Sequence, residues 1–154
     1  MEKLEKKNGM EKLMLETLME QQREYFASGA TLPVKVRMEA LSRLEKALQK
    51  QEQILCKALH TDLGKSKTES VMCEIGLVQG EIRWMKQHLG RLCRTKHVRT
   101  PLAQFAAKSY QSPSPYGNVL IMSPWNYPVL LTLEPLVDAI AAGNTAVVKP
   151  SAYA

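Results

Sequence analysis

The apolar positions in the first part of the chain follow the spacing of amphipathic helices. Three stretches repeat an i, i+3, i+4 pattern, and Gly29 with Pro33, then Gly64, then Gly90 mark where they end. An apolar stripe on a charged helix needs a partner, so we expect these helices to pack against other elements. The stripes consist of Met10, Leu13, Met14, Thr17 and Leu18, then Val34, Met38, Leu41, Leu44 and Leu48 (continuing to Leu55 and Leu59), then Val71, Ile75, Val78, Ile82, Met85 and Leu89.

The pattern changes near Thr100, where short apolar runs alternate with proline-rich turns. The runs predict a strand at 104–110, a connector at 112–115, a buried strand at 116–122, a helix at 128–142 and a strand at 145–149. The last three form one βαβ unit, whose two-stranded parallel sheet leaves both edges and one face uncovered. The predicted fold class is α/β, with a helical segment (1–99), a strand and connector (100–115) and an incomplete further domain (116–154).

The distribution of charge argues against a nucleic-acid-binding protein. The net charge is +6, but all except two of the 21 basic and two of the 15 acidic residues precede Thr100, as on a solvated helical surface. The densest basic stretch, residues 91–99, has no aromatic residue to stack on bases, so we expect a solvated connector there. The sequence shows neither a membrane-spanning run nor a signal peptide. Its three cysteines are irregularly spaced, which favours reduced thiols in the cytoplasm and does not fit a zinc site.

The most informative stretch is Ser123-Pro124-Trp125-Asn126-Tyr127-Pro128, between the buried strand and the helix. Its two prolines exclude a regular strand or helix interior, because each removes a hydrogen-bond donor and fixes φ. We therefore predict a stiff loop that presents Asn126 at the carboxyl end of a strand, where ligands bind in open α/β sheets. A neutral amide can donate a hydrogen bond to an oxygen that gains negative charge, although asparagine is also common in plain turns.

Together with the strand that follows, this stretch resembles the start of the cofactor domain of aldehyde dehydrogenases. The motifs that carry the resemblance are residues 123–128, 136–144 and 147–151, and residues 61–66 and 100–105 are similar to the class-3-like branch. The resemblance implies a Rossmann-like cofactor domain, of which this chain has the first βαβ unit after its N-terminal amphipathic helices. Because members of the family run to several hundred residues, we expect the chain to be the N-terminal part of such an enzyme.

The resemblance also implies roles for particular side chains. The residue matching Asn126 is one donor of the oxyanion hole, and the other donor is a backbone N–H of the catalytic cysteine. The residue matching Lys149 hydrogen-bonds the adenosine ribose of NAD or NADP. Many members carry a glutamate where this chain has Ala152, so we expect both cofactors to be accepted. The remaining residues expected to line the cofactor cleft are Ser123, Pro124, Trp125 and Ser151, with Ile121 and Met122 as its apolar floor.

The implied reaction oxidises an aldehyde to a carboxylic acid through a cysteine thiohemiacetal and a thioester, which a glutamate hydrolyses by activating water. None of Cys56, Cys73 and Cys93 matches the family's nucleophile, and the base is missing too, so residues 1–154 alone should be inactive. In the full-length enzyme the expected partners are the aldehyde and a second copy in a homodimer, with no nucleic acid.

Two other interpretations follow from the helical part of the chain. Residues 63–66, Leu-Gly-Lys-Ser, resemble the end of a phosphate-binding P-loop, but that motif needs a glycine where Leu59 stands and a strand before it. The P-loop interpretation is therefore rejected. The alternative to an enzyme segment is a non-catalytic helical interaction module, or a gene remnant, in which the first hundred or so residues bind a full-length partner.

Overall fold

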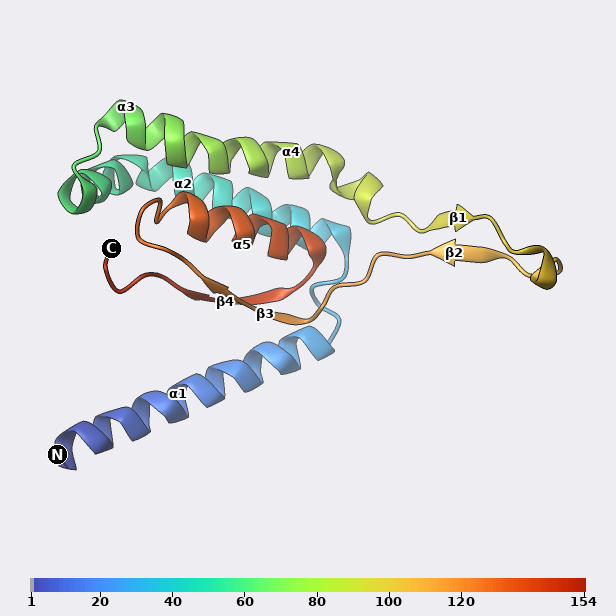
Figure 1. Cartoon of the computed structure of the whole chain (residues 1–154), viewed down its shortest axis with the longest axis horizontal. Helices are drawn as coiled ribbons and strands as arrows, with labels where there is room; N and C mark the ends of the chain where they lie inside the picture. The colour runs from blue at the N-terminus through green and yellow to red at the C-terminus, as the bar shows by residue number, and fades with distance from the viewer. Residues whose placement is uncertain (1) are drawn as a thin grey trace.

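The computed structural model describes the backbone of residues 2–154 and the side chains from Lys12 onward. Helices α2 and α4 lie side by side, α5 packs against both, and strands β3 and β4 lie between α5 and α1 (Figure 1). The elements are α1 (Glu2–Ala27), α2 (Val34–Leu63), α3 (Lys67–Ser70), the π-helix η1 (Val71–Ile75), α4 (Gly76–Leu92), β1 (Lys96–Val98), the 3₁₀-helix η2 (Leu102–Gln104), β2 (Ser109–Gln111), β3 (Asn118–Met122), α5 (Leu130–Ala142) and β4 (Thr145–Lys149).

The three predicted helices are present, and the hydrophobic core forms where the second and third meet α5. Leu41 of α2, Ile75 of η1, Ile82 of α4 and Val137 of α5 are fully buried in one hydrophobic cluster. The periodicity of the second and third stripes therefore identified the core side of these helices correctly. The predicted end of the third helix is wrong, because α4 continues past Gly90 to Leu92.

The apolar stripe of α1 is not covered by the rest of the chain. Leu13 and Met14 are 64% and 68% exposed, and Leu18 is 41% exposed. The predicted helix is present and ends before Gly29, whose φ of 72° reverses the chain direction. Met10, also predicted on this stripe, lies outside the described side chains. Only the last part of α1 approaches the body of the protein (Figure 1).

The predicted βαβ unit is present, with β3 and β4 paired in parallel from Asn118 opposite Thr145 to Met122 opposite Lys149. The prediction that one face of this sheet is uncovered is wrong in part. The last part of α1 contacts both strands from the side opposite α5 (Figure 1), but Leu120 and Met122 of β3 stay 62% and 69% exposed. The prediction of a buried first strand is also wrong in part. Ile121 is 8% exposed but Met122 is 69% exposed, since neighbouring residues on a strand point to opposite faces.

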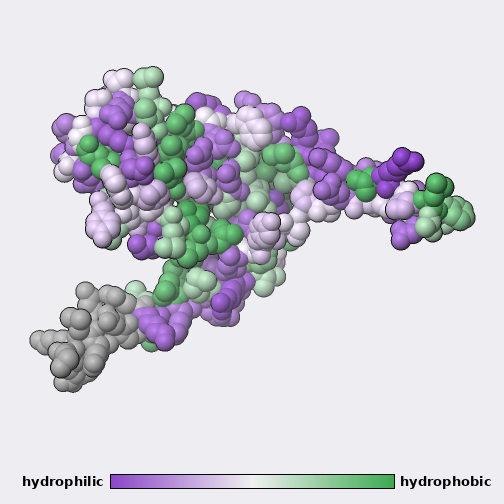
Figure 2. Space-filling model, viewed as in Figure 1, coloured by the Kyte–Doolittle hydropathy of each residue, from purple (hydrophilic) through white to green (hydrophobic). Residues whose placement is uncertain are grey.

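A short hairpin replaces the structure predicted between α4 and β3. Strands β1 and β2 pair antiparallel, so the predicted connector at 91–99 contains a strand. The strand predicted at 104–110 is present only from residue 109 and continues to residue 111. The hairpin projects from the body and carries a hydrophobic tip, where Leu102 and Phe105 are each 86% exposed (Figures 1 and 2). It joins strands on both sides of the boundary predicted at residue 99, and the three-part domain division stays a prediction.

Arg37 links the turn before α2 to the end of α5. Its buried guanidinium donates to the carbonyls of Thr31 (2.9 Å) and Leu32 (2.6 Å) in the turn before α2, and to the carbonyl of Ala141 (3.1 Å) in α5. Gly143 ends α5 with a φ of 88°, and a Cβ there would lie 2.7 Å from the Arg37 Cζ atom. The end of α5 therefore needs glycine for its backbone conformation and for the space that Arg37 occupies.

Replacing Gly143 by alanine should destabilise the chain by about 1–3 kcal/mol, because the new methyl group meets Arg37 and the backbone is strained. We expect the melting temperature, followed by circular dichroism, to fall by roughly 5 °C. Gly80→Ala in α4 is the matched control, since a Cβ there meets nothing within 4 Å and alanine favours a helix. An equal change in melting temperature for the two variants would contradict this role of Gly143.

Candidate active-site loop

The predicted stiff loop follows β3 and lies beside the carboxyl end of β4. Met122 is in register with Lys149, and the Ser123 N–H donates to the Lys149 carbonyl at 3.2 Å, which extends the pairing by one residue. The Thr132 hydroxyl of α5 donates to the Ser123 hydroxyl at 2.6 Å. The structure thus brings the predicted residues after β3 and the predicted residues after β4 to one edge of the sheet, where ligands bind in α/β folds.

The side chains at this edge are open to solvent. Asn126 is exposed, and its side-chain amide forms no hydrogen bond within the part of the chain that the structure describes. Trp125 is 55% exposed, and the Ser151 hydroxyl accepts the Tyr153 N–H at 3.0 Å. Of the two residues expected to form an apolar floor, only Ile121 is buried, whereas Met122 is exposed. The individual roles of these residues stay predictions.

A buried ion pair that the sequence did not suggest lies directly behind the loop. Lys65 and Glu74 are 7% and 0% exposed, and the Lys65 Nζ atom is 2.5 Å from a Glu74 oxygen. Lys65 belongs to the segment that resembled a P-loop. Gly64 there has a φ of 68° and terminates α2, and the Ser66 hydroxyl caps α3 by accepting the Glu69 N–H at 3.1 Å. The segment is therefore a helix-to-helix turn that directs a lysine inward.

The ion pair contacts the loop at the Asn126 backbone and at the residues that follow it. Lys65 Nζ donates to the Asn126 carbonyl at 3.0 Å and lies 3.8 Å from the centre of the Tyr127 ring, an arrangement that favours a cation–π interaction. The other Glu74 oxygen accepts the N–H groups of Val129 at 2.8 Å and Leu130 at 3.1 Å. N–H groups at the start of a helix have no acceptor within the helix, so Glu74 supplies one. Its negative charge also complements the dipole of α5.

Comparison with known proteins identifies the fold around this loop. The profile of the "Aldehyde dehydrogenase family" matches residues 4–154. The chain belongs to the aldehyde dehydrogenase family. The 4,4'-diaponeurosporen-aldehyde dehydrogenase of Staphylococcus aureus is 46% identical over 127 residues, which are 82% of this chain and 28% of that protein. Human aldehyde dehydrogenase family 3 member B1 is 42% identical over 129 residues, 84% of this chain and 28% of that protein.

A solved aldehyde dehydrogenase has the same arrangement of elements. The structure described as the substrate-bound state of Staphylococcus aureus AldH superposes with a TM-score of 0.87 at 43% identity, covering 89% of this chain and 30% of that one. The similarity to a class-3 branch and to the N-terminal part of an α/β fold, with an incomplete domain, is thereby confirmed. The chain spans less than a third of the length of these aldehyde dehydrogenases.

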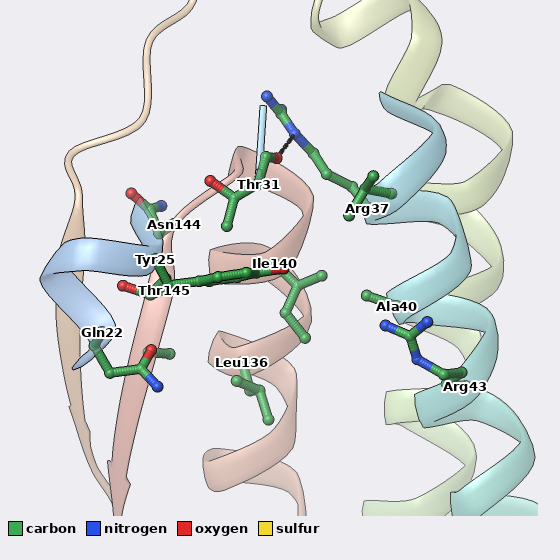
Figure 3. A pocket seen from close by; sticks show the side chains of 12 residues that line it. Gln22, Tyr25, Thr31, Arg37, Ala40, Arg43, Leu136, Ile140, Asn144 and Thr145 are labelled. Carbon is green, nitrogen blue, oxygen red and sulfur yellow. Dashed lines mark hydrogen bonds between the residues drawn. The ribbon is translucent and has the colours of Figure 1, made fainter. Parts of the chain in front are cut away.

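The hollow in Figure 3 is separate from the aldehyde dehydrogenase loop. This pocket, of about 290 Å³, lies between α1, α2, α5 and the first residues of β4 (Figure 3). It is lined by Tyr25, Ile140 and two threonines, Thr31 and Thr145, whose buried hydroxyls have no hydrogen-bond partner in the part of the chain that the structure describes. Because Thr145 begins β4 and Lys149 ends it, this pocket lies at the opposite end of the strand from the candidate site.

Other titratable groups lie away from the loop of this aldehyde dehydrogenase segment. Burial raises the pKa of Glu81, with further contributions from the charges of Asp138 and Glu134, and burial also raises the pKa of Asp138. Within residues 12–154, no group of three or more His, Cys, Asp or Glu side chains is placed to hold a metal ion. Among the described residues, no helix is both long and apolar enough to cross a membrane.

Proposed function

We propose that this chain is the N-terminal part of an NAD(P)⁺-dependent aldehyde dehydrogenase that oxidises aldehydes to carboxylic acids. The observation that carries the proposal is the exposed Asn126 amide, on the loop at the carboxyl edge of a βαβ unit with the family's fold. An amide that is free in the folded chain can donate its N–H to the oxyanion formed when a thiolate attacks an aldehyde. The attacking cysteine and the general base belong to the remainder of the enzyme.

The residues at the end of β4 fit the adenosine end of a nicotinamide cofactor. The Lys149 ammonium is exposed, and no ion pair engages it among the residues whose side chains are described. Its three N–H donors suit the vicinal hydroxyls of a ribose or a phosphate attached to it. When bound, the cofactor accepts hydride from the substrate carbon, and this chain would contribute part of its ribose site and one oxyanion donor.

The proposal is tested with a chimeric enzyme in which residues 1–154 replace the matching segment of the Staphylococcus aureus dehydrogenase. We expect the chimera to reduce NAD⁺ or NADP⁺ with at least one of a panel of aldehydes that includes the aldehyde named for the relative. Residues 1–154 alone should give no reduction, because the nucleophile and base are absent. Activity of the isolated chain, or a folded chimera without activity on any aldehyde, would reject the proposal.

We also propose that the complete enzyme is a cytoplasmic homodimer. Cys56, Cys73 and Cys93 are not paired in disulfides, which is the usual state of thiols in a reducing compartment. The exposed hydrophobic tip of the β1–β2 hairpin supports association, because apolar patches on the surface commonly mark interfaces. Light scattering of the chimeric enzyme measures the assembly, and a monomer would contradict the expected homodimer.

A further inference from the structure

Burial of the ion pair between Lys65 and Glu74 is not in itself evidence that the pair stabilises the fold. Removing two charges from water carries a large desolvation cost, and apolar side chains of the same volume often stabilise a core equally well or better. The pair is nevertheless fully engaged, since both Glu74 oxygens and the Lys65 ammonium have partners. Apart from the bond between the two side chains, these partners all lie in the segment from Asn126 to Leu130. This points to a function of the pair in the loop.

The contacts of the pair hold the loop at the Asn126 backbone and over the residues that follow it, as far as the start of α5. Lys65 binds the Asn126 carbonyl and lies over the Tyr127 ring, while Glu74 binds the N–H groups of Val129 and Leu130. The exposed Asn126 amide has no bond of its own to orient it within the described part of the chain. Its position is therefore set by its backbone, and the backbone is held by the ion pair.

The π-helical turn η1 positions Glu74 for its contacts with the loop. Glu74 lies in η1, where the Gly76 N–H bonds the Val71 carbonyl five residues earlier instead of four. A Cβ at Gly76 would lie 2.7 Å from that carbonyl oxygen, so the wide turn needs glycine at this position. Single π turns inside helices occur frequently at functional sites. Here the turn sets the direction in which Glu74 leaves the helix.

We propose that Lys65 and Glu74 are positioning residues that hold Asn126 in the geometry of an oxyanion donor. This inference rests on the proposed function, because it assigns the pair to the same reaction. An oxyanion donor acts only when it lies 2.7–3.1 Å from the developing charge, and a misplacement of about 1 Å can cost roughly a hundredfold in rate. Lys65 and Glu74 set this distance without touching the substrate.

The first test is a double-mutant cycle in the chimeric enzyme. Lys65→Met and Glu74→Gln should each lower kcat by about tenfold while the KM for the cofactor changes by less than about twofold. In an Asn126→Ala background, the same substitutions should change kcat by less than about twofold, because the donor that they position is already gone. Lys86→Met is the matched control, since it breaks the 2.7 Å ion pair to Glu45 between α4 and α2. It should leave kcat unchanged.

The second test measures the loop in residues 1–154 without any chemistry. Amide hydrogen exchange of residues 123–131 should accelerate by about tenfold or more in Lys65→Met, and the exchange of the α2 core should stay unchanged. Lys86→Met should alter neither region. If Lys65→Met does not fold, Glu74→Asp serves instead, because the shorter carboxylate keeps its charge but cannot reach Lys65 and the N–H groups of Val129 and Leu130 together.

The outcomes separate the inference from the proposed function. If Asn126→Ala leaves kcat unchanged, the oxyanion role of Asn126 is wrong and the proposed function fails at that point. Asn126→Ala lowers kcat in the expected case. If Lys65→Met and Glu74→Gln then lower kcat in the Asn126→Ala background by the same factor as in the parent, the pair acts elsewhere and the inference is overturned. Unchanged kcat in Lys65→Met, or in Glu74→Asp where that variant is used, overturns it as well.

Discussion

Replacing Asn126 by alanine in the chimeric enzyme should lower kcat by about a hundredfold, because deleting one oxyanion donor typically costs about 3 kcal/mol in the transition state. Binding of the cofactor should change little, since Asn126 lies on the loop after β3 and the ribose contacts are predicted for Lys149, the last residue of β4. The measurement is the kcat of the purified variant at saturating aldehyde and cofactor, together with the KM for each.

Two further substitutions test whether the loss of kcat comes from the missing amide of Asn126. Asn126→Asp keeps the size of the side chain but replaces the N–H donor with a carboxylate, so the loss in kcat should be at least as large. Gln49→Ala removes an amide from the exposed surface of α2 and should leave kcat unchanged. Activity of Asn126→Ala within a few-fold of the parent would mean that Asn126 is only a turn residue.

Periodicity identified the long elements of the fold because each buries one face in a shared core. The stripe from Val71 to Leu89 contains Ile75 and Ile82, which are fully buried. The two parallel strands were predicted from two short apolar runs on either side of a helix. The β1–β2 hairpin was missed because its strands are three residues each and almost entirely exposed, so neither alternation nor burial marks them. The contact of α1 with the sheet depends on a turn direction that periodicity does not encode.

The candidate site was predicted only as far as its residues are adjacent in sequence. Lys65 and Glu74 are 61 and 55 residues away from their partners Asn126 and Val129, and no local pattern connects them. A usable signal existed in the third stripe, because Glu74 lies three residues after Val71 and four before Val78, on the apolar side of the helix. A carboxylate in an apolar stripe predicts a buried charge with a partner, which here is the lysine of the rejected P-loop motif.

Introducing a glutamate at Ala152 should shift the cofactor preference of the chimeric enzyme toward NAD⁺ by about tenfold or more. Residues 150–154 contain no acidic side chain, and the exposed Lys149 is the charged group beside this position. A phosphate on the ribose would therefore meet a cation and no repelling carboxylate, so the parent should accept NADP⁺ as well as NAD⁺, with a preference below about a hundredfold. A glutamate at position 152 adds an acceptor for the ribose hydroxyls and repels the phosphate.

The measurement is the ratio of kcat/KM for NAD⁺ to kcat/KM for NADP⁺ in the parent and in the variant. Ala152→Gln is the matched control, because it adds an acceptor of the same length without a charge. If charge repulsion excludes the phosphate, Ala152→Glu should lower kcat/KM for NADP⁺, and Ala152→Gln should leave it within about threefold of the parent. Strict use of NAD⁺ by the parent would contradict the predicted acceptance of both cofactors, and equal ratios in the parent and Ala152→Glu would contradict a role of position 152 at the ribose.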